Sequence, residues 1–199
     1  MLAMKKEKSS SKPQRSVRAK DVKVISSKLV YDGPVFQVYT DHVHEGDYTG
    51  RRDVIRHSGS IVVLALEEVR GRGPRILLVR QYRHPARRHL WELPAGRVDR
   101  GEKMLSAAKR ELLEETGIRA KKWKHAFRFF ASPGFLDETM DVFLARELSM
   151  GEAQPEEDEQ IEVRFFSLRK AVEMVMKNKI TDAKTMTGVL WLERKLRGK

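Results

Sequence analysis

Three glutamates in one short stretch have the spacing of a divalent-metal site. Glu111, Glu114 and Glu115 stand at i, i+3 and i+4, so on a helix they project from one face within a few ångströms of each other. Three such charges repel one another unless a cation neutralises them. Carboxylate oxygens without His or Cys are the ligands that Mg²⁺ or Mn²⁺ prefers over zinc. The alternative is a solvated helix face with local ion pairs.

The residues around these glutamates have helical periodicity. From about Lys103 to Thr116 the apolar side chains form one stripe, made by Leu105, Ala108, Leu112 and Leu113. Asp99 and Glu102, three residues apart, predict a capping box at the start of this helix. Gly117 supplies the left-handed residue that ends it.

Short β-rich runs surround the helix and must position it. Strands before it are expected at residues 22–31, 35–43, 48–57, 60–68 and 75–83. The first three read as an antiparallel meander, and the last two are nearly continuous in apolar residues, as in strands buried on both faces. After the helix, strands are expected at 123–131, 140–147 and 161–168, and helices at 169–178 and 182–197. The pattern predicts a mixed α/β sandwich with an N-terminal strand extension.

Composition sets limits on the kind of protein. The 199 residues contain no cysteine, which excludes disulfides and thiolate chemistry and indicates a reducing, cytoplasmic location. No apolar run is long enough for a membrane span, so we expect no membrane partner. Half of the net charge of +12 lies in residues 1–20, which hold seven Lys or Arg and one Glu. We interpret this segment as a disordered, solubilising tail, with RNA or phospholipid binding as the alternative.

The helix and the loop before it carry a longer motif. Gly96, Glu102, Arg110-Glu111-Leu112, Glu114-Glu115 and Gly117-Ile118 resemble the Nudix box, Gly-x5-Glu-x7-Arg-Glu-U-x-Glu-Glu-x-Gly-U with U aliphatic. Every specified position over 23 residues is met. The resemblance implies an α/β/α sandwich of Nudix type with a mixed sheet. It also implies hydrolysis of a nucleoside diphosphate linked to another group.

Three segments outside the box narrow the resemblance. Residues 79–85, 91–96 and 132–138 look like those of the ADP-ribose pyrophosphatases, and Pro133 stands sixteen residues after Gly117, where that subfamily carries a proline. The similarity begins at about residue 22 and reaches the C-terminus. After the tail at 1–20, it implies a strand extension for dimerisation at 21–57 and a Nudix hydrolase domain at 58–199.

The resemblance also implies a metal-binding set. The Ala95 carbonyl, Glu111 and Glu115 ligate Mg²⁺, or alternatively Mn²⁺, and Glu114 shares an ion, with two or three ions in each site. Glu115 is therefore counted among the catalytic residues. Arg110 is implied to be an orienting ion-pair partner of the box carboxylates. Glu102 either reaches a metal or caps the helix.

The general base and the substrate contacts are implied by similarity as well. The base is expected in the acidic loop at 155–160, as either Glu157 or Glu159. Substrate contacts are expected from Arg83 to the diphosphate, from Arg51 into the partner subunit's site, from Glu138 to the adenine amino group, and from Ser132 and Glu92 in the pocket wall. The subfamily's sites are completed across a two-fold interface, which implies a homodimer.

Three functions follow as competing hypotheses. The first is Mg²⁺-dependent hydrolysis of ADP-ribose, a nucleotide-sugar substrate, to AMP and ribose 5-phosphate. The second is hydrolysis of another nucleotide sugar such as GDP-mannose, or of a dinucleotide. The third is a non-catalytic, RNA-binding Nudix protein that uses the basic tail, which the intact glutamates argue against.

Overall fold

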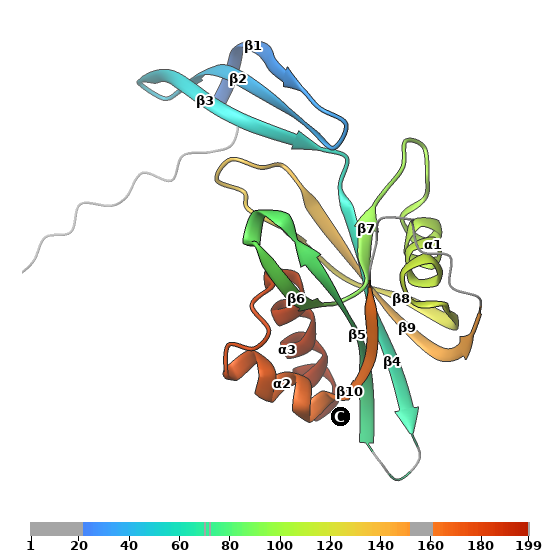
Figure 1. Ribbon diagram of the computed structural model, residues 1–199. Helices are drawn as coiled ribbons and strands as arrows, with labels where there is room; N and C mark the ends of the chain where they lie inside the picture. Colours follow the sequence, from blue (N-terminus) through green and yellow to red (C-terminus); the bar gives the residue numbers. More distant parts are fainter. Residues whose placement is uncertain (1–21, 70, 72, 152–160, 199) are drawn as a thin grey trace, which may run out of the picture.

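The computed structural model describes residues 22–69, 71, 73–151 and 161–198. It contains a small and a large β-sheet with helices on both faces of the large one (Figure 1). The elements before the box are β1 (Val22–Asp32), β2 (Phe36–Glu45), β3 (Tyr48–His57), β4 (Ser60–Val69), β5 (Gly73–Arg83), a 3₁₀ turn η2 (His84–Ala86), β6 (Arg88–Glu92) and β7 (Ala95–Arg97). The others are α1 (Met104–Thr116), β8 (Ile118–Phe130), β9 (Thr139–Met150), β10 (Glu162–Ser167), α2 (Leu168–Met176) and α3 (Ala183–Arg197).

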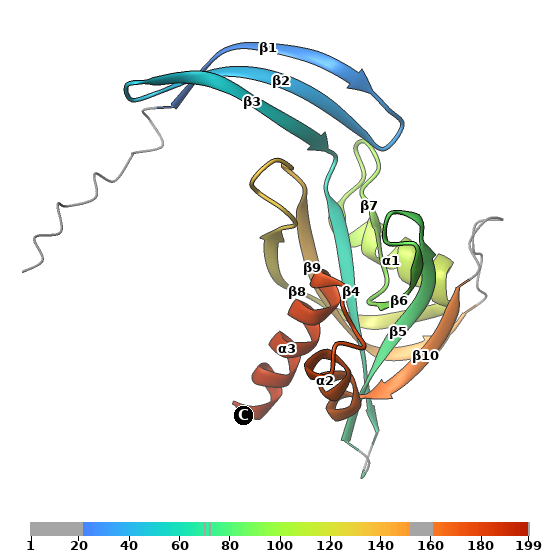
Figure 2. The same cartoon turned by 60° about the vertical axis from the view of Figure 1, so that its left-hand side comes forward.

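The first three strands form the predicted antiparallel meander, in the order β1-β2-β3. This small sheet stands apart from the large one and is joined to it where β3 runs into β4 (Figures 1 and 2). Every residue of β1 is exposed. Strand β1 therefore buries little of its own apolar surface within one chain.

The large sheet has seven strands, five of them in the order β10-β5-β4-β9-β8. The β4 and β9 strands are parallel, and the other neighbours are antiparallel. The β5 strand pairs with β4 only from Leu66 onward, while β7 pairs with the start of β4 through Val62 and Ala95. The two strands thus diverge, and the segment that carries Ala95 enters the opening between them.

The apolar run of β4 is buried on both faces, as predicted. Ile61, Val63 and Ala65 pack in one core with α1, whereas Val62 and Leu64 pack in the other core with α2 and α3. Because successive side chains of a strand point to opposite faces, an uninterrupted apolar run suits a strand covered on both sides. These contacts confirm the α/β/α sandwich.

The predicted extent of α1 is confirmed to within one residue at its start, but the predicted capping box does not form there. The helix begins at Met104 with Lys103 in the N-cap position, and Lys103 makes no side-chain capping hydrogen bond. The Glu102 carboxylate accepts from the Asp99 backbone N–H at 3.2 Å, so the expected pair closes the turn before the helix. Gly117 has φ 66° and ends the helix, because glycine adopts the left-handed region without a steric cost.

The two C-terminal helices have side-chain caps. Ser167 precedes α2 and accepts from the Lys170 N–H, and Asp182 precedes α3 and accepts from the Thr185 N–H. Both helices pack on the face of the sheet opposite α1 (Figures 1 and 2). None of the helices in the described ranges is long and apolar enough to cross a membrane.

Candidate functional site

The box glutamates line a cavity beside α1. Its volume is about 400 Å³, and its wall includes six residues singled out from the sequence: Arg83, Ala95, Arg110, Glu111, Glu114 and Glu115. The α1 helix supplies four of them, β5 supplies Arg83 and β7 supplies Ala95. The divergence of β4 from β5 admits the β7 segment, and this places the end of β5 opposite the glutamate face of α1.

Arg110 is the centre of the carboxylate cluster. Its Nη1 donates to Glu111 Oε1 at 2.8 Å and to Glu114 Oε2 at 3.0 Å, and its Nη2 donates to Glu102 Oε2 at 3.0 Å. Nη2 also donates to the Arg97 carbonyl at 3.1 Å. The hydrogen bond with Arg110 lowers the pKa of Glu102, and the same bond raises the pKa of Arg110. Arg110 therefore offsets the mutual repulsion of the glutamates and fixes their directions.

The β7 segment lies directly against the α1 glutamates. The Ala95 N–H donates to Glu115 Oε2 at 3.2 Å, and Glu115 is only 6% exposed. A Cβ at Gly96 would lie 1.9 Å from the Glu111 carboxyl carbon, so any side chain at this position would displace that carboxylate. The glycine of the motif is thus needed because a carboxylate packs on its Cα.

The ligand atoms that the cavity offers are of the chemical type that binds a hard divalent cation. The cavity offers carboxylate oxygens from α1 and the backbone of Ala95, and ligands of this type suit Mg²⁺ or Mn²⁺. In the part of the chain that the structure describes, no three Asp, Glu or His side chains converge as a metal-binding group. Glu102, Glu111 and Glu114 instead have Arg110 as a common partner.

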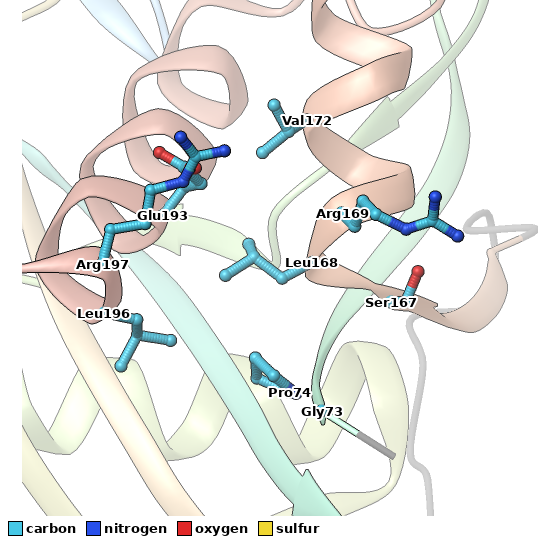
Figure 3. Close-up of a pocket in the computed structure, with 9 residues that line it drawn as sticks. All are labelled: Gly73, Pro74, Ser167, Leu168, Arg169, Val172, Glu193, Leu196 and Arg197. Atoms are coloured by element: carbon cyan, nitrogen blue, oxygen red, sulfur yellow. The ribbon is translucent and has the colours of Figure 1, made fainter.

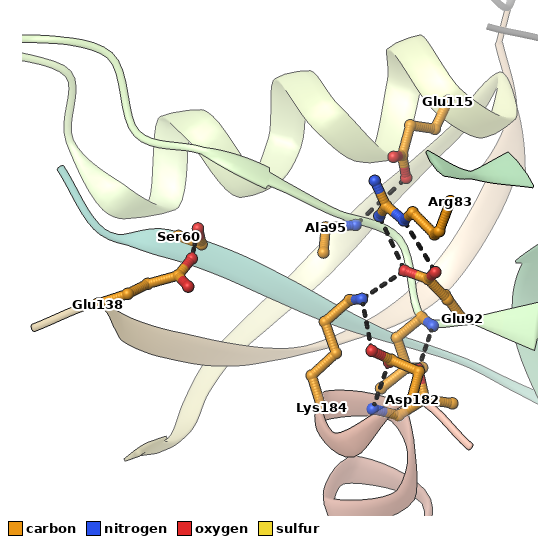
Figure 4. Close-up of polar contacts among 10 residues, drawn as sticks. Ser60, Arg83, Glu92, Ala95, Glu115, Glu138, Asp182 and Lys184 are labelled. Carbon is orange, nitrogen blue, oxygen red and sulfur yellow. Dashed lines mark hydrogen bonds and ion pairs between the residues drawn. The ribbon is translucent and has the colours of Figure 1, made fainter. Parts of the chain in front are cut away.

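Arg83 has a fixed position on the cavity wall. Its Nε and Nη2 donate to the two oxygens of Glu92 at 2.9 and 2.8 Å (Figure 4). Glu92 is 1% exposed and also pairs with Lys184 of α3. In Figure 4 Arg83 lies between Glu92 and Glu115. The pKa of Arg83 is raised, chiefly by the hydrogen bonds to Glu92.

Glu138 and Ser132 lie on the loop between β8 and β9, outside the lining of this cavity. Glu138 Oε1 accepts from the Ser60 hydroxyl at 2.5 Å and lies 3.6 Å from His57 Nδ1. The Ser132 carbonyl accepts from the Leu136 N–H at 3.0 Å. The loop is joined to β3, where the Ile55 N–H donates to the Phe135 carbonyl at 2.7 Å. It therefore connects the small sheet with the large one.

Arg51, which was also singled out from the sequence, is not among the residues that line this cavity. Arg51 lies on β3, where its Nε donates to Asp53 at 2.8 Å and its side chain is 63% exposed. The hydrogen bond to Asp53 raises the pKa of Arg51. Glu157 and Glu159 lie outside the described residues.

The cavity is also lined by four residues that were not assigned a role from the sequence: Val35, His57, Gln81 and Arg97. His57 Nδ1 accepts from the Gly59 N–H at 3.1 Å, so in a neutral ring the proton lies on Nε2. His57 ends a strand of the small sheet and Gln81 lies on β5. Gln81 lies in the segment 79–85 that carries the family resemblance, whereas no local motif includes His57, and only the fold brings the two residues together.

A second cavity, of about 570 Å³, lies between α2 and α3 at the turn from β4 to β5 (Figure 3). Its wall is mainly apolar, from Pro74, Leu168, Val172 and Leu196. The charged side chains on it include Arg197 and Glu193, which form an ion pair with each other. It contains none of the box residues.

Comparison with known proteins identifies the family. The model of the NUDIX domain matches residues 56–187, well over half of the chain, and the chain therefore belongs to the Nudix family. This confirms the resemblance seen in the box. The protein is a Nudix hydrolase, and members of this family generally use divalent metal ions.

Individual relatives agree with this assignment. The chain is 36% identical to an ADP-ribose pyrophosphatase of Bacillus subtilis (strain 168), over 90% of this chain and 96% of that protein. It is 32% identical to a methanol dehydrogenase activator of Bacillus methanolicus, over 86% of this chain and 92% of that protein. A solved structure of an ADP compounds hydrolase superposes with a TM-score of 0.76 at 19% identity, covering 93% of this chain and 98% of that one, and shows a shared fold.

Proposed function

We propose that this chain hydrolyses the pyrophosphate bond of ADP-ribose, in a Mg²⁺-dependent reaction, to AMP and ribose 5-phosphate. The observation that carries the proposal is the carboxylate cluster around Arg110, which faces Arg83 across one cavity. Such a site combines anionic ligands for cations with a cationic group for phosphate. The relative at 36% identity, named ADP-ribose pyrophosphatase, supports the choice of substrate.

The metal-binding role is assigned to Glu111, Glu115 and the Ala95 carbonyl, with Glu114 sharing an ion and two or three ions in each site. When bound, these ions would neutralise the diphosphate and acidify a water molecule for attack on phosphorus. Arg110 orients the carboxylates, since it donates to Glu111 and Glu114. Glu102 is the anchor of Arg110, through two hydrogen bonds of 3.2 and 3.0 Å, and we place it in this supporting role.

Arg83 is assigned to the diphosphate. Glu92 accepts from its Nε and Nη2, and a guanidinium has five N–H donors, so three remain directed elsewhere. A planar fork of this kind suits phosphate oxygens. Glu92 acts on the substrate through Arg83, because a side chain with 1% exposure has little surface to offer a ligand.

The general base is proposed to be Glu157 or Glu159, which removes the proton of the attacking water. The proposal rests on similarity to the subfamily, since both residues lie outside the described ranges. A carboxylate is a weak base, but neighbouring acids raise its pKa.

Glu138 is proposed to accept from the adenine amino group, with Ser132 beside it. Glu138 would then exchange its hydrogen bond from the Ser60 hydroxyl for one from the adenine amino group.

We also propose that the protein is a homodimer formed through the extension at 21–57. Strand β1 exposes large apolar side chains, with Val24 59%, Ile25 62% and Val30 53% exposed, and such a surface is typical of an interface. Arg51 would then reach the partner subunit's site. Size-exclusion chromatography with light scattering tests this. A monomer would refute both the interface and the role of Arg51.

The substrate is tested with a product-resolved assay of the purified protein. ADP-ribose, GDP-mannose, other nucleotide sugars, NADH and diadenosine polyphosphates are compared with Mg²⁺ and with a chelator. The proposal predicts AMP and ribose 5-phosphate, formed preferentially from ADP-ribose and only with the metal. Preference for another substrate would contradict the assignment of Glu138 to adenine, and the metal-dependent chemistry proposed for the box would still stand. No turnover of any substrate would refute the enzymatic proposal and favour a binding protein.

A further inference from the structure

A lysine outside the Nudix box is buried and is connected through Glu92 to the cavity-lining Arg83. Lys184, in the first turn of α3, is 7% exposed, and lysine is rarely buried to this extent unless it is paired. Taking an ammonium group out of water is unfavourable by itself. The position therefore needs a compensating partner, and the structure shows two.

Lys184 belongs to a row of four alternating charges. Its Nζ donates to Glu92 Oε2 and, at 3.1 Å, to Asp182 Oδ1 (Figure 4). Glu92 in turn accepts the two hydrogen bonds from Arg83. The order Arg83, Glu92, Lys184, Asp182 is positive, negative, positive, negative, so the row is neutral as a whole.

Glu92 Oε2 is the shared atom of this row. It accepts from Arg83 Nη2 on one side and from Lys184 Nζ on the other. Burial is the largest influence on the pKa of Glu92 and raises it, but the hydrogen bonds from Arg83 and the charge of Lys184 outweigh burial, so the pKa is lowered. Both cations thus keep this carboxylate ionised and in place.

The far end of the row is fixed to the fold. Asp182 Oδ2 accepts from the N–H of Thr185 at 3.0 Å and from its hydroxyl at 2.6 Å. The Thr185 hydroxyl accepts from the Leu93 N–H at 2.8 Å, and Leu93 follows Glu92 directly. The N-terminus of α3 therefore holds the segment of Glu92 and Leu93 at two points. Thr185 binds the Leu93 backbone N–H, and Lys184 binds the Glu92 carboxylate.

We propose that Lys184 is a positioning residue for substrate binding, which acts through Glu92 to hold the Arg83 guanidinium towards the diphosphate. The inference rests on the proposed function for the identity of the ligand. The competing view is that Lys184 only stabilises the attachment of α3. Under that view its loss lowers stability and leaves substrate affinity unchanged.

The test measures substrate affinity in Lys184→Met, which keeps the length of the side chain and removes its charge. We expect a dissociation constant for ADP-ribose, by calorimetry in chelator, on the order of tenfold higher than wild type, because a misplaced binding group is costly. With Mg²⁺ the KM rises by a similar factor and kcat changes little. Lys184→Arg, which keeps the charge, restores most of the affinity.

A double-mutant cycle separates positioning from stability. If Lys184 acts through Glu92, Glu92→Gln and the double variant Glu92→Gln, Lys184→Met bind ADP-ribose equally weakly. Effects that multiply in the double variant would refute the proposal. Lys177→Met is the matched control, since Lys177 pairs with Glu173 on the surface of α2, and it should bind like wild type. If Lys184→Met does not fold, Lys184→Gln takes its place.

The outcomes separate this inference from the proposed function. A wild-type chain that binds and hydrolyses ADP-ribose, with Lys184→Met folded and of equal affinity, refutes the positioning role alone. A wild-type chain inactive on ADP-ribose refutes the proposed substrate, and the cycle is then run on whichever substrate of the panel is turned over. If none is turned over or bound, both proposals fall.

Discussion

The buried row of charges makes Glu92 a sensitive position for stability. In Glu92→Gln the amide keeps the shape of the side chain, but Lys184 and Arg83 lose their shared counter-ion. Removing one partner of a buried ion pair costs about 3–5 kcal/mol, and we expect the lower end, about 3 kcal/mol, because Lys184 keeps Asp182 at 3.1 Å. For a chain of this size that corresponds to a fall in Tm of about 6–12 °C.

The assay is urea unfolding followed by circular dichroism, with Glu173→Gln as the matched control. Glu173 also pairs with two cations, Lys170 at 3.2 Å and Lys177 at 2.8 Å, but its side chain is 42% exposed. Water and ions screen such surface pairs, so the control should keep the wild-type midpoint. Equal midpoints for Glu92→Gln and Glu173→Gln would refute the reasoning that burial makes this row important.

The same comparison has a defined pH dependence. The pKa of Glu92 is below its ordinary value of 4.5, so its ionised form is favoured in the folded chain. A carboxyl group of this kind adds stability above its unfolded pKa and loses that contribution as the pH falls through the folded pKa. The advantage of wild type over Glu92→Gln should therefore be constant near pH 7 and shrink below about pH 4.5. An advantage that grows in acid would contradict the pKa direction.

Three further predictions concern the site. Gly96→Ala should retain the fold and lose on the order of 10²-fold in kcat, because its Cβ would displace the Glu111 carboxylate and misplaced catalytic groups cost about that much; wild-type kinetics would show that this close approach is unimportant. Of Glu157→Gln and Glu159→Gln, the variant at the true base should lose on the order of 10²–10⁴ in rate and the other little; two active variants would exclude the loop. Deleting residues 1–20 should leave turnover unchanged, and lost activity would give the tail a catalytic role.

Much of the fold could be predicted because its signals are local. The apolar run at 60–68 predicted a strand buried on both faces, and the structure shows Ile61 and Val62 in opposite cores. Of the predicted stripe on α1, Ala108 and Leu112 are buried, whereas Leu105 is exposed. Gly117 ends the helix in the left-handed conformation, as its residue type predicted. The short strands β6 and β7 escaped prediction, since five and three residues are too few to establish a period.

Asp99 and Glu102 were predicted to interact as a capping box, and they interact in the turn before α1 instead, through the Asp99 backbone N–H. The Glu102 side chain is held by Arg110, which a capping pattern cannot anticipate. The carboxylate cluster itself was predictable, because i, i+3 and i+4 spacing on a helix fixes neighbours without knowledge of the fold.

Long-range contacts set the limit of what could be predicted. Lys184 and Glu92 are 92 residues apart in sequence, and nothing near Lys184 distinguishes it from other lysines of this basic chain. The sequence placed Glu92 in the wall of the substrate pocket by similarity. The structure shows it 1% exposed and paired with Arg83 and Lys184. Such contacts depend on which strands pair and on where α3 packs, and neither is visible in the local sequence.

The most direct test of the central claim compares wild type with Glu115→Gln on ADP-ribose. Products are separated by chromatography after incubation with Mg²⁺ and, in parallel, with a chelator. We predict equal amounts of AMP and ribose 5-phosphate from the wild-type protein with Mg²⁺, none with chelator, and none from Glu115→Gln with an unchanged circular dichroism spectrum. Near wild-type turnover by Glu115→Gln, or turnover that persists in chelator, would contradict a metal-dependent reaction at the carboxylate cluster of α1.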